Sequence, residues 1–257
     1  MNLKQNYIAF STIVRKEVVR FTRIWTQTLV PPIITQSLYF LIFGKFIGSQ
    51  IREINGIDYM GFIVPGLVMM AVINASYVNV VGSFFSSKFQ RSVEELLVSP
   101  VPNFVIIAGY VVGGALRGII VGCLVFGVSF FFTQPQIENI FIIILFMILT
   151  AITFALGGFI NAIFAKKFDD VSIFPTFVLT PLTYLGGVFY SITALPELWQ
   201  NVSKFNPILY MVNGFRYGFY GFTDVNIGIS FGILIGFILI LTGLNLYLLK
   251  KGVGLRT

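Results

Sequence analysis

The sequence predicts an all-α integral membrane protein. Apolar residues make up 56% of its 257 residues and charged residues only 11%, less than half of the roughly 25% that is usual in globular proteins. The mean hydropathy is +0.90. The chain also contains 25 glycines, and glycine is commoner in membrane-spanning helices than in soluble ones. These values predict a chain that crosses the membrane several times.

Six segments are long and apolar enough to cross a bilayer, which takes roughly 20 residues of helix. The charged residues within them are Lys45, near the end of the first, and Arg117 in the third. We therefore expect a single transmembrane domain over residues 1–257. Its predicted spans are residues 24–48, 59–87, 103–132, 139–165, 171–192 and 225–249.

The first 23 residues predict an amphipathic helix that lies in the membrane interface. Apolar side chains recur every three or four residues from Tyr7 to Trp25, the spacing of one helix face. The opposite face carries Lys16, Arg20 and Arg23. A basic face of this kind is expected to lie against anionic lipid.

The distribution of Lys and Arg predicts the orientation in the membrane. With six spans both termini lie on one side, and that side collects 12 of the 17 Lys and Arg residues against four on the other. The side richer in Lys and Arg is normally cytoplasmic. We therefore expect both termini and residues 88–102 in the cytoplasm, and residues 191–224 outside.

A short polar segment, residues 88–102, interrupts the apolar sequence between the second and third spans. Within it, Ser92 and Glu95 have the spacing of a capping box, in which each side chain binds the other's backbone N–H. Glu94 and Glu95 lie in the first turn, where negative charge is favoured, and Pro100 ends the helix. The segment is either a compact turn or a short cytoplasmic helix on which a soluble partner docks; the docking residues would be Arg91, Ser92, Glu94, Glu95, Leu96 and Leu97.

Two short helices are expected outside the membrane after the fifth span. Asn206 is placed to cap the second of them and Pro207 suits its first turn. The apolar stretch that follows has 15 residues, Ile208–Phe222. As a helix it would rise about 22 Å, which is too short for a core of about 30 Å. We expect these helices to dip into the outer leaflet and roof the space between the spans, with Asn206, Pro207, Tyr210 and Arg216 as the roof residues.

The third span has a charged residue and a row of small ones. Arg117 stands near mid-membrane, where an arginine costs roughly 2.5–3.5 kcal/mol even on insertion scales. It either binds free carbonyls of a broken neighbouring helix or lines a substrate path, for which Asn74 and Asn79 are the other candidates, although intramembrane asparagines commonly bond between helices. The small residues predict a close-packing face: Gly109, Gly113, Gly114, Gly118 and Gly122.

Several of these residues resemble the bacterial ABC-2 type transporter permeases. The matching residues are Pro181–Tyr190, Leu195-Pro196, Asn206-Pro207, Tyr210, Arg216 and Gly218. Residues 91–97 followed by Pro100 are similar to that family's coupling loop, in which a small residue usually stands where Arg91 is here. The resemblance implies a homodimer that works with two copies of a separate ATPase, with Glu94 on the coupling helix.

The composition argues against other functional classes. The chain has no histidine, the commonest general base and metal ligand, which disfavours a membrane-embedded enzyme. It also lacks the phosphate-binding loop of an ATPase, since Gly44-Lys45 is followed by Phe46. The ten Asp and Glu residues fall at span ends or in loops, whereas an ion-coupled secondary transporter or channel, the alternative reading, needs intramembrane carboxylates.

The sequence therefore predicts the permease subunit of an ATP-driven exporter in the bacterial cytoplasmic (inner) membrane. Its substrate would be an amphiphilic or lipid-linked molecule. No cofactor is expected in this chain, because ATP would be bound by the partner. Apart from that partner and a second copy of the chain, we expect contact with membrane lipid and none with nucleic acid.

Overall fold

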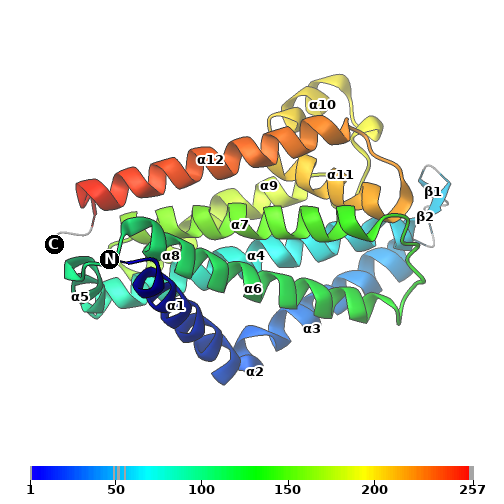
Figure 1. Cartoon of the computed structure of the whole chain (residues 1–257). Helices are drawn as coiled ribbons and strands as arrows, with labels where there is room; N and C mark the ends of the chain where they lie inside the picture. The colour runs from blue at the N-terminus through cyan, green and yellow to red at the C-terminus, as the bar shows by residue number, and fades with distance from the viewer. Residues whose placement is uncertain (1, 49, 51–52, 55, 255–257) are drawn as a thin grey trace.

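The computed structural model is a bundle of long helices, crossed at a steep angle by the N-terminal helix α1 (Leu3–Arg23) (Figure 1). The structure describes residues 2–48, 50, 53–54 and 56–254. Arg52 and Arg256, which contribute to the charge count, lie outside the described residues. Within the described residues the strands are β1 (Glu53–Ile54) and β2 (Ile57–Asp58), paired antiparallel in a short hairpin.

Five helices in the described chain are long and apolar enough to cross a membrane. They agree closely with five of the predicted spans: Trp25–Ile47, α4 (Tyr59–Phe89), α6 (Asn103–Ser129), α7 (Ile140–Phe164) and α12 (Ile227–Lys251). The first of them is not one regular helix. It consists of α2 (Trp25–Thr28), α3 (Val30–Tyr39) and the π-helical segment η1 (Phe40–Ile47).

Helix α4 forms the centre of the bundle. It is apolar on all sides and almost every one of its side chains is buried, as expected of a helix surrounded by others. Its main neighbours are α6 and α7. The small residues of α6 make the predicted close-packing face: a Cβ on Gly114 or Gly118 would overlap Val80 or Ser76 of α4. The close approach of these helices is therefore encoded in the glycines.

The fifth predicted span differs from the observed structure. Residues 171–192 were expected to form one helix, but the helical run comprises α8 (Phe168–Phe174), the π-helical η2 (Pro175–Leu179) and α9 (Thr180–Tyr184). Together they rise about 26 Å, less than a full span. The helical run ends at Tyr184. Three residues later the chain turns at Gly187, whose φ of +73° lies in the left-handed region that glycine tolerates.

Two short helices follow, as expected: α10 (Glu197–Lys204) and α11 (Pro207–Tyr220), with a 3₁₀ turn, η3 (Ile192–Ala194), before them. The Asn206 side chain accepts a hydrogen bond from the Ile208 N–H at 3.0 Å, which confirms the predicted cap. Helix α11 packs against α7, α12 and α4. It is therefore an integral part of the bundle as well as a cover over it.

Helix α1 packs on the bundle with a different face from the one expected. Its buried side chains are Ile13, Glu17 and Phe21, and its main neighbour is α6. Lys16 and Arg20, expected to face anionic lipid, instead bond to groups on α4 and α6. The expectation that these two side chains face lipid was wrong. The apolar periodicity of α1 does not reveal the polar contacts that attach this helix to α4 and α6.

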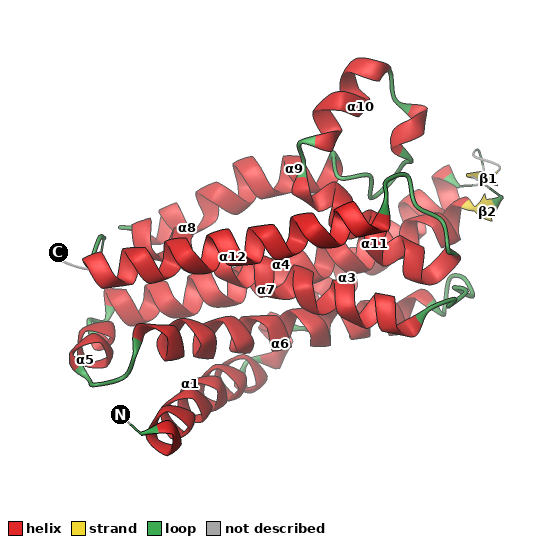
Figure 2. Cartoon of the chain, turned by 45° about the horizontal axis from the view of Figure 1, so that its top comes forward, coloured by secondary structure: helices red, strands yellow, loops and turns green. Residues whose placement is uncertain are grey.

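The two ends of the bundle carry different features. The start of α1, the end of α12 and the short helix α5 (Ser92–Val98) gather at one end (Figure 1). The β1–β2 hairpin lies at the opposite end, and α10 protrudes beside the bundle toward that end (Figure 2). This arrangement matches the predicted grouping of the termini with residues 88–102 on one side.

Candidate functional site

The end of the bundle that carries α5 contains most of the residues predicted to bind a partner. The chain turns between α4 and α5 at Arg91, whose φ of +60° makes it the only described non-glycine residue with a positive φ. Only glycine adopts this conformation without steric cost. The left-handed turn at Arg91 therefore carries a steric cost.

The predicted capping box at the start of α5 is wrong. The residue at the N-cap is Arg91, not Ser92, and it makes no side-chain cap. The Ser92 hydroxyl donates to the carbonyl oxygen of Ser87 at 3.1 Å, which ties α5 back to the end of α4. Because the turn at Arg91 shifts the helix start by one residue, Glu95 no longer stands three residues after the cap.

Helix α5 has one packed face and one open face. Val93 is buried, and Leu96 and Leu97 are half-buried against the core. Glu94 and Glu95 are exposed, and so is Val98, with 87% of its surface accessible. An exposed acidic and apolar surface on a helix that is anchored from behind is suited to docking a partner.

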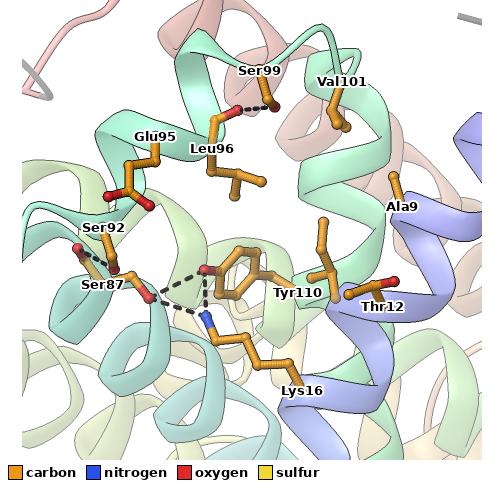
Figure 3. Close-up of a pocket in the computed structure, with 11 residues that line it drawn as sticks. Ala9, Thr12, Lys16, Ser87, Ser92, Glu95, Leu96, Ser99, Val101 and Tyr110 are labelled. Carbon is orange, nitrogen blue, oxygen red and sulfur yellow. Dashed lines mark hydrogen bonds between the residues drawn. The ribbon is translucent and has the colours of Figure 1, made fainter.

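A cavity of about 550 Å³ lies behind α5, between it, α1 and α6 (Figure 3). At its base the Lys16 ammonium donates to Ser87 Oγ at 3.3 Å and to the Tyr110 hydroxyl at 3.2 Å. The Tyr110 hydroxyl in turn donates to Ser87 Oγ. Glu95 and Leu96 of α5 line the same cavity. Helix α5 is thus joined to α1 across a hollow rather than through a packed core.

Glu17 is a fully buried carboxylate that the sequence reasoning overlooked, because it assigned all acids to span ends and loops. Its Oε2 lies 3.0 Å from Arg20 Nη2 and accepts from Asn79 Nδ2 at 3.4 Å, and its Oε1 accepts from the Ser83 hydroxyl. Arg20 also donates to the side-chain and backbone oxygens of Asn79. A signal was present in the sequence, since Glu17 stands four residues from both Ile13 and Phe21, on one helix face.

Arg117 is buried inside the bundle and bonds to a broken helix. Its Nη2 donates to the carbonyl oxygen of Thr28 at 3.1 Å. In a continuous helix that carbonyl would receive the N–H of residue 32, but residue 32 is proline and has none. Arg117 therefore satisfies a carbonyl that the sequence of the neighbouring helix leaves free, while its Nε has no acceptor among the described residues.

Arg117 also lines a cavity of about 320 Å³ at the side of α3. Asn74 of α4 lines it too, together with polar residues of the first span: Gln27, Thr35 and Gln36. Asn79, the third residue predicted for a substrate path, is not in this group, because its side chain is taken up by Arg20 and Glu17. The structure therefore brings two of the three predicted path residues together.

The residues predicted to form the roof make hydrogen bonds that connect α11 to neighbouring segments. Arg216 is fully buried and its Nη2 donates to the Gly187 carbonyl at 2.7 Å, while its guanidinium carbon lies 3.9 Å from the ring centre of Phe62. Asn206 Nδ2 donates to the Leu182 carbonyl, and the Tyr210 hydroxyl to the Lys204 carbonyl. These contacts hold α11 against α9, α10 and the irregular segment after α9.

Among the described residues, no group of three or more His, Cys, Asp or Glu side chains could hold a metal ion.

Comparison with known protein families identifies the class of this helical bundle. The sequence model of the ABC-2 type transporter family matches residues 8–220. Because this match covers most of the chain, the protein belongs to the ABC-2 type transporter family. With its apolar helices, it is a multi-pass membrane transport permease.

Two relatives illustrate the range of similarity. The chain is 55% identical over 251 residues to the inner membrane transport permease YadH of Escherichia coli strain K12, and the match covers 98% of each chain. It is 21% identical over 249 residues to nodulation protein J of Rhizobium meliloti strain 1021, covering 96% of this chain and 91% of that protein. The similarity extends over the whole length in both cases, and it supports an inner-membrane location.

Proposed function

We propose that the protein is the non-catalytic membrane subunit of an ATP-driven exporter, moving an amphiphilic or lipid-linked substrate across the cytoplasmic membrane. A separate ATPase subunit binds ATP and docks on α5. Two copies of this chain form a homodimer that works with two copies of the ATPase. In this arrangement α5 and both termini face the cytoplasm, where ATP is available.

The observation that carries the proposal is the geometry of α5. Val93 and the Ser92–Ser87 hydrogen bond fix the helix to α4, so that a force applied to α5 reaches the central helix directly. Its open face presents Glu94 and Glu95, which favour a partner with basic residues at the contact.

The cavity beside Arg117 supports a role in the substrate path. A buried guanidinium with a free Nε, next to the amide of Asn74, offers hydrogen-bond donors to an anionic group such as a phosphate. Few side chains of α3 and α12 are buried within the bundle. These apolar surfaces are available to lipid and to the second copy of the chain.

The alternative is an ion-coupled secondary transporter or channel, and Glu17 is the residue that would serve it. An ion-coupled carboxylate must exchange its ion during transport. Glu17 instead holds Arg20, Asn79 and Ser83, all from α1 and α4. We therefore favour a structural role for Glu17 and ATP as the energy source.

Reconstitution tests the proposal. The purified permease is placed in vesicles with and without a candidate ATPase subunit, and ATP hydrolysis is measured. We expect the ATPase to be stimulated by the permease and the permease alone to hydrolyse nothing. Transport driven by an ion gradient without nucleotide would overturn the proposal in favour of the alternative.

A further inference from the structure

A second cavity, of about 600 Å³, lies on another side of the α4–α5 corner. It is formed by the end of α4, the turn at Arg91, the end of α7 and Gly254 after α12. Three of its lining residues are cationic and three are aromatic; they are Lys88, Arg91 and Lys166, and Phe85, Phe89 and Phe164. None of these described lining residues is acidic, so the cavity combines positive charge with an apolar wall.

Two of the three cations are free to bind a ligand. Lys88 is engaged, since its ammonium donates to the carbonyl oxygens of Ile163 and Ala165 at 2.6 and 2.8 Å, where α7 ends. The exposed side chains of Arg91 and Lys166 make no hydrogen bond or ion pair within the described part of the chain. Arg91 thus offers a planar fork of donors and Lys166 a point charge, the two kinds of group that bind phosphate.

Asp170 offsets only part of this positive charge, because it brings one carboxylate to a corner with three cations. The Asp170 carboxylate accepts the backbone N–H groups of Lys166 and Lys167 at 2.8 and 3.0 Å. These bonds hold the pKa of Asp170 below its usual value and engage its Oδ2 in the turn. The corner therefore keeps a net positive charge.

The aromatic residues place the cavity at the boundary between lipid and water. Phe89 and Phe164 are exposed at the ends of two membrane-spanning helices. Phe89 packs against the equally exposed Phe168, with ring centres 4.9 Å apart. The phenylalanine rings offer an apolar surface to acyl chains, while Lys and Arg at span ends attract anionic headgroups. A small hydrated anion would gain nothing from these rings, but the acyl chains of a lipid would.

We propose that this cavity binds the phosphate headgroup of an anionic membrane lipid. Arg91 and Lys166 contact the phosphate, Lys88 adds positive charge from behind, and the acyl chains run over Phe89 and Phe164. The bound lipid joins the turn before α5 to the end of α7. The site does not depend on an ATPase or on the transported substrate.

Lipid binding to the purified protein tests this site. Native mass spectrometry compares the occupancy of phosphatidylglycerol and phosphatidylcholine on the wild type, Arg91→Gln, Lys166→Gln and the double variant. Both residues are exposed, and glutamine removes the charge while keeping a flexible polar side chain at each position. We expect a preference for phosphatidylglycerol that weakens on the order of tenfold or more in the double variant.

The matched control is the double variant Lys250→Gln with Lys251→Gln, which removes two cations from the end of α12 at the same end of the bundle. It should keep the phosphatidylglycerol preference. An equal loss in this control would show a general surface charge and overturn the site, as would equal binding of phosphatidylcholine. Displacement of phosphatidylglycerol by inorganic phosphate alone would assign the cavity to a free anion instead of a lipid.

Discussion

Arg117 on α6 supplies the hydrogen bond that Pro32 denies to the carbonyl of Thr28, at 3.1 Å. The same solution occurs a second time. Pro65 inside α4 leaves the carbonyl of Gly61 without its helical N–H, and the hydroxyl of Tyr220 on α11 donates to that carbonyl at 2.9 Å. In lipid a free carbonyl is costly because no water can reach it. For each of these two prolines, a side chain on another helix therefore supplies the missing hydrogen-bond donor.

Replacing Arg117 by alanine should destabilise the protein. The Thr28 carbonyl would be left unpaired, at a cost of about 1–3 kcal/mol. Thermal unfolding of the detergent-purified protein measures the change. Pro32→Ala is the matched partner, because it returns an N–H at the position that faces Thr28. The double variant should recover part of the lost stability.

A different result would assign Arg117 to the substrate. If Arg117→Ala unfolds at the wild-type temperature but abolishes transport in reconstituted vesicles, its role is to line the path. Arg117→Lys adds detail, since lysine keeps the charge and loses the planar fork of donors.

Tyr220→Phe should lower the stability by about 1–3 kcal/mol, because it removes only the hydroxyl that pairs with the Gly61 carbonyl. In a Pro65→Ala background the same change should cost much less, since the backbone then supplies the donor. Thermal unfolding of the four proteins forms a double-mutant cycle. A cost for Tyr220→Phe that is the same in both backgrounds would refute the pairing.

Glu94→Arg should abolish the stimulation of ATP hydrolysis while the subunit still inserts and purifies normally. Reversing a charge at a desolvated contact changes attraction into repulsion, worth a few kcal/mol. Glu95→Gln should have a smaller effect, because it keeps the shape of a residue that lines the cavity behind α5. Small and equal effects of both changes would return residues 88–102 to the interpretation of a compact turn.

The orientation can be tested by cysteine labelling in a Cys123→Ser background. Ser92→Cys on α5 and Asn201→Cys on α10 are both at exposed positions. An impermeant maleimide should label Asn201→Cys from outside in intact cells and Ser92→Cys only after the membrane is opened. Labelling of Ser92→Cys from outside would invert the proposed topology.

Two adjacent glycines of α7 test the close packing of the core. A Cβ on Gly158 would lie 2.6 Å from the Tyr77 carbonyl oxygen of α4, while a Cβ on Gly157 would make ordinary contact at 3.9 Å with the Tyr77 ring. Gly158→Ala should therefore cost about 1–3 kcal/mol. Gly157→Ala should be neutral or stabilising by up to about 1 kcal/mol. Equal unfolding temperatures for the two variants would contradict the packing.

The sequence predicted the features that follow from hydrophobic length and local chemistry. The ends of α4, α6, α7 and α12 lie within about three residues of the predicted limits, because apolar runs are bounded by charged residues at the membrane surface. The Asn206 cap and the close-packing glycines could also be predicted, because each depends on a fixed spacing along a helix.

What the sequence did not reveal depends on contacts between distant segments. The burial of Glu17 requires Asn79 and Ser83, more than 60 residues away. The early end of the fifth predicted span depends on Gly187 and on Arg216. Arg216 lies on α11 and donates a hydrogen bond to the carbonyl oxygen of Gly187. The failed capping box results from the left-handed turn at Arg91, a conformation that no propensity for arginine predicts.

The near-complete burial of α4 has a mechanical consequence. From Pro65 to Phe89 the helix continues without another proline and rises about 36 Å, from the level of the Tyr220 contact to the corner at Arg91. Proline is the usual place for a helix to bend, and here it lies at the far end from α5. We therefore expect this segment to move as a rigid unit. A displacement of α5 would then shift the whole length of the segment. The bending would occur at Pro65, where Tyr220 and α11 hold the other end of the helix.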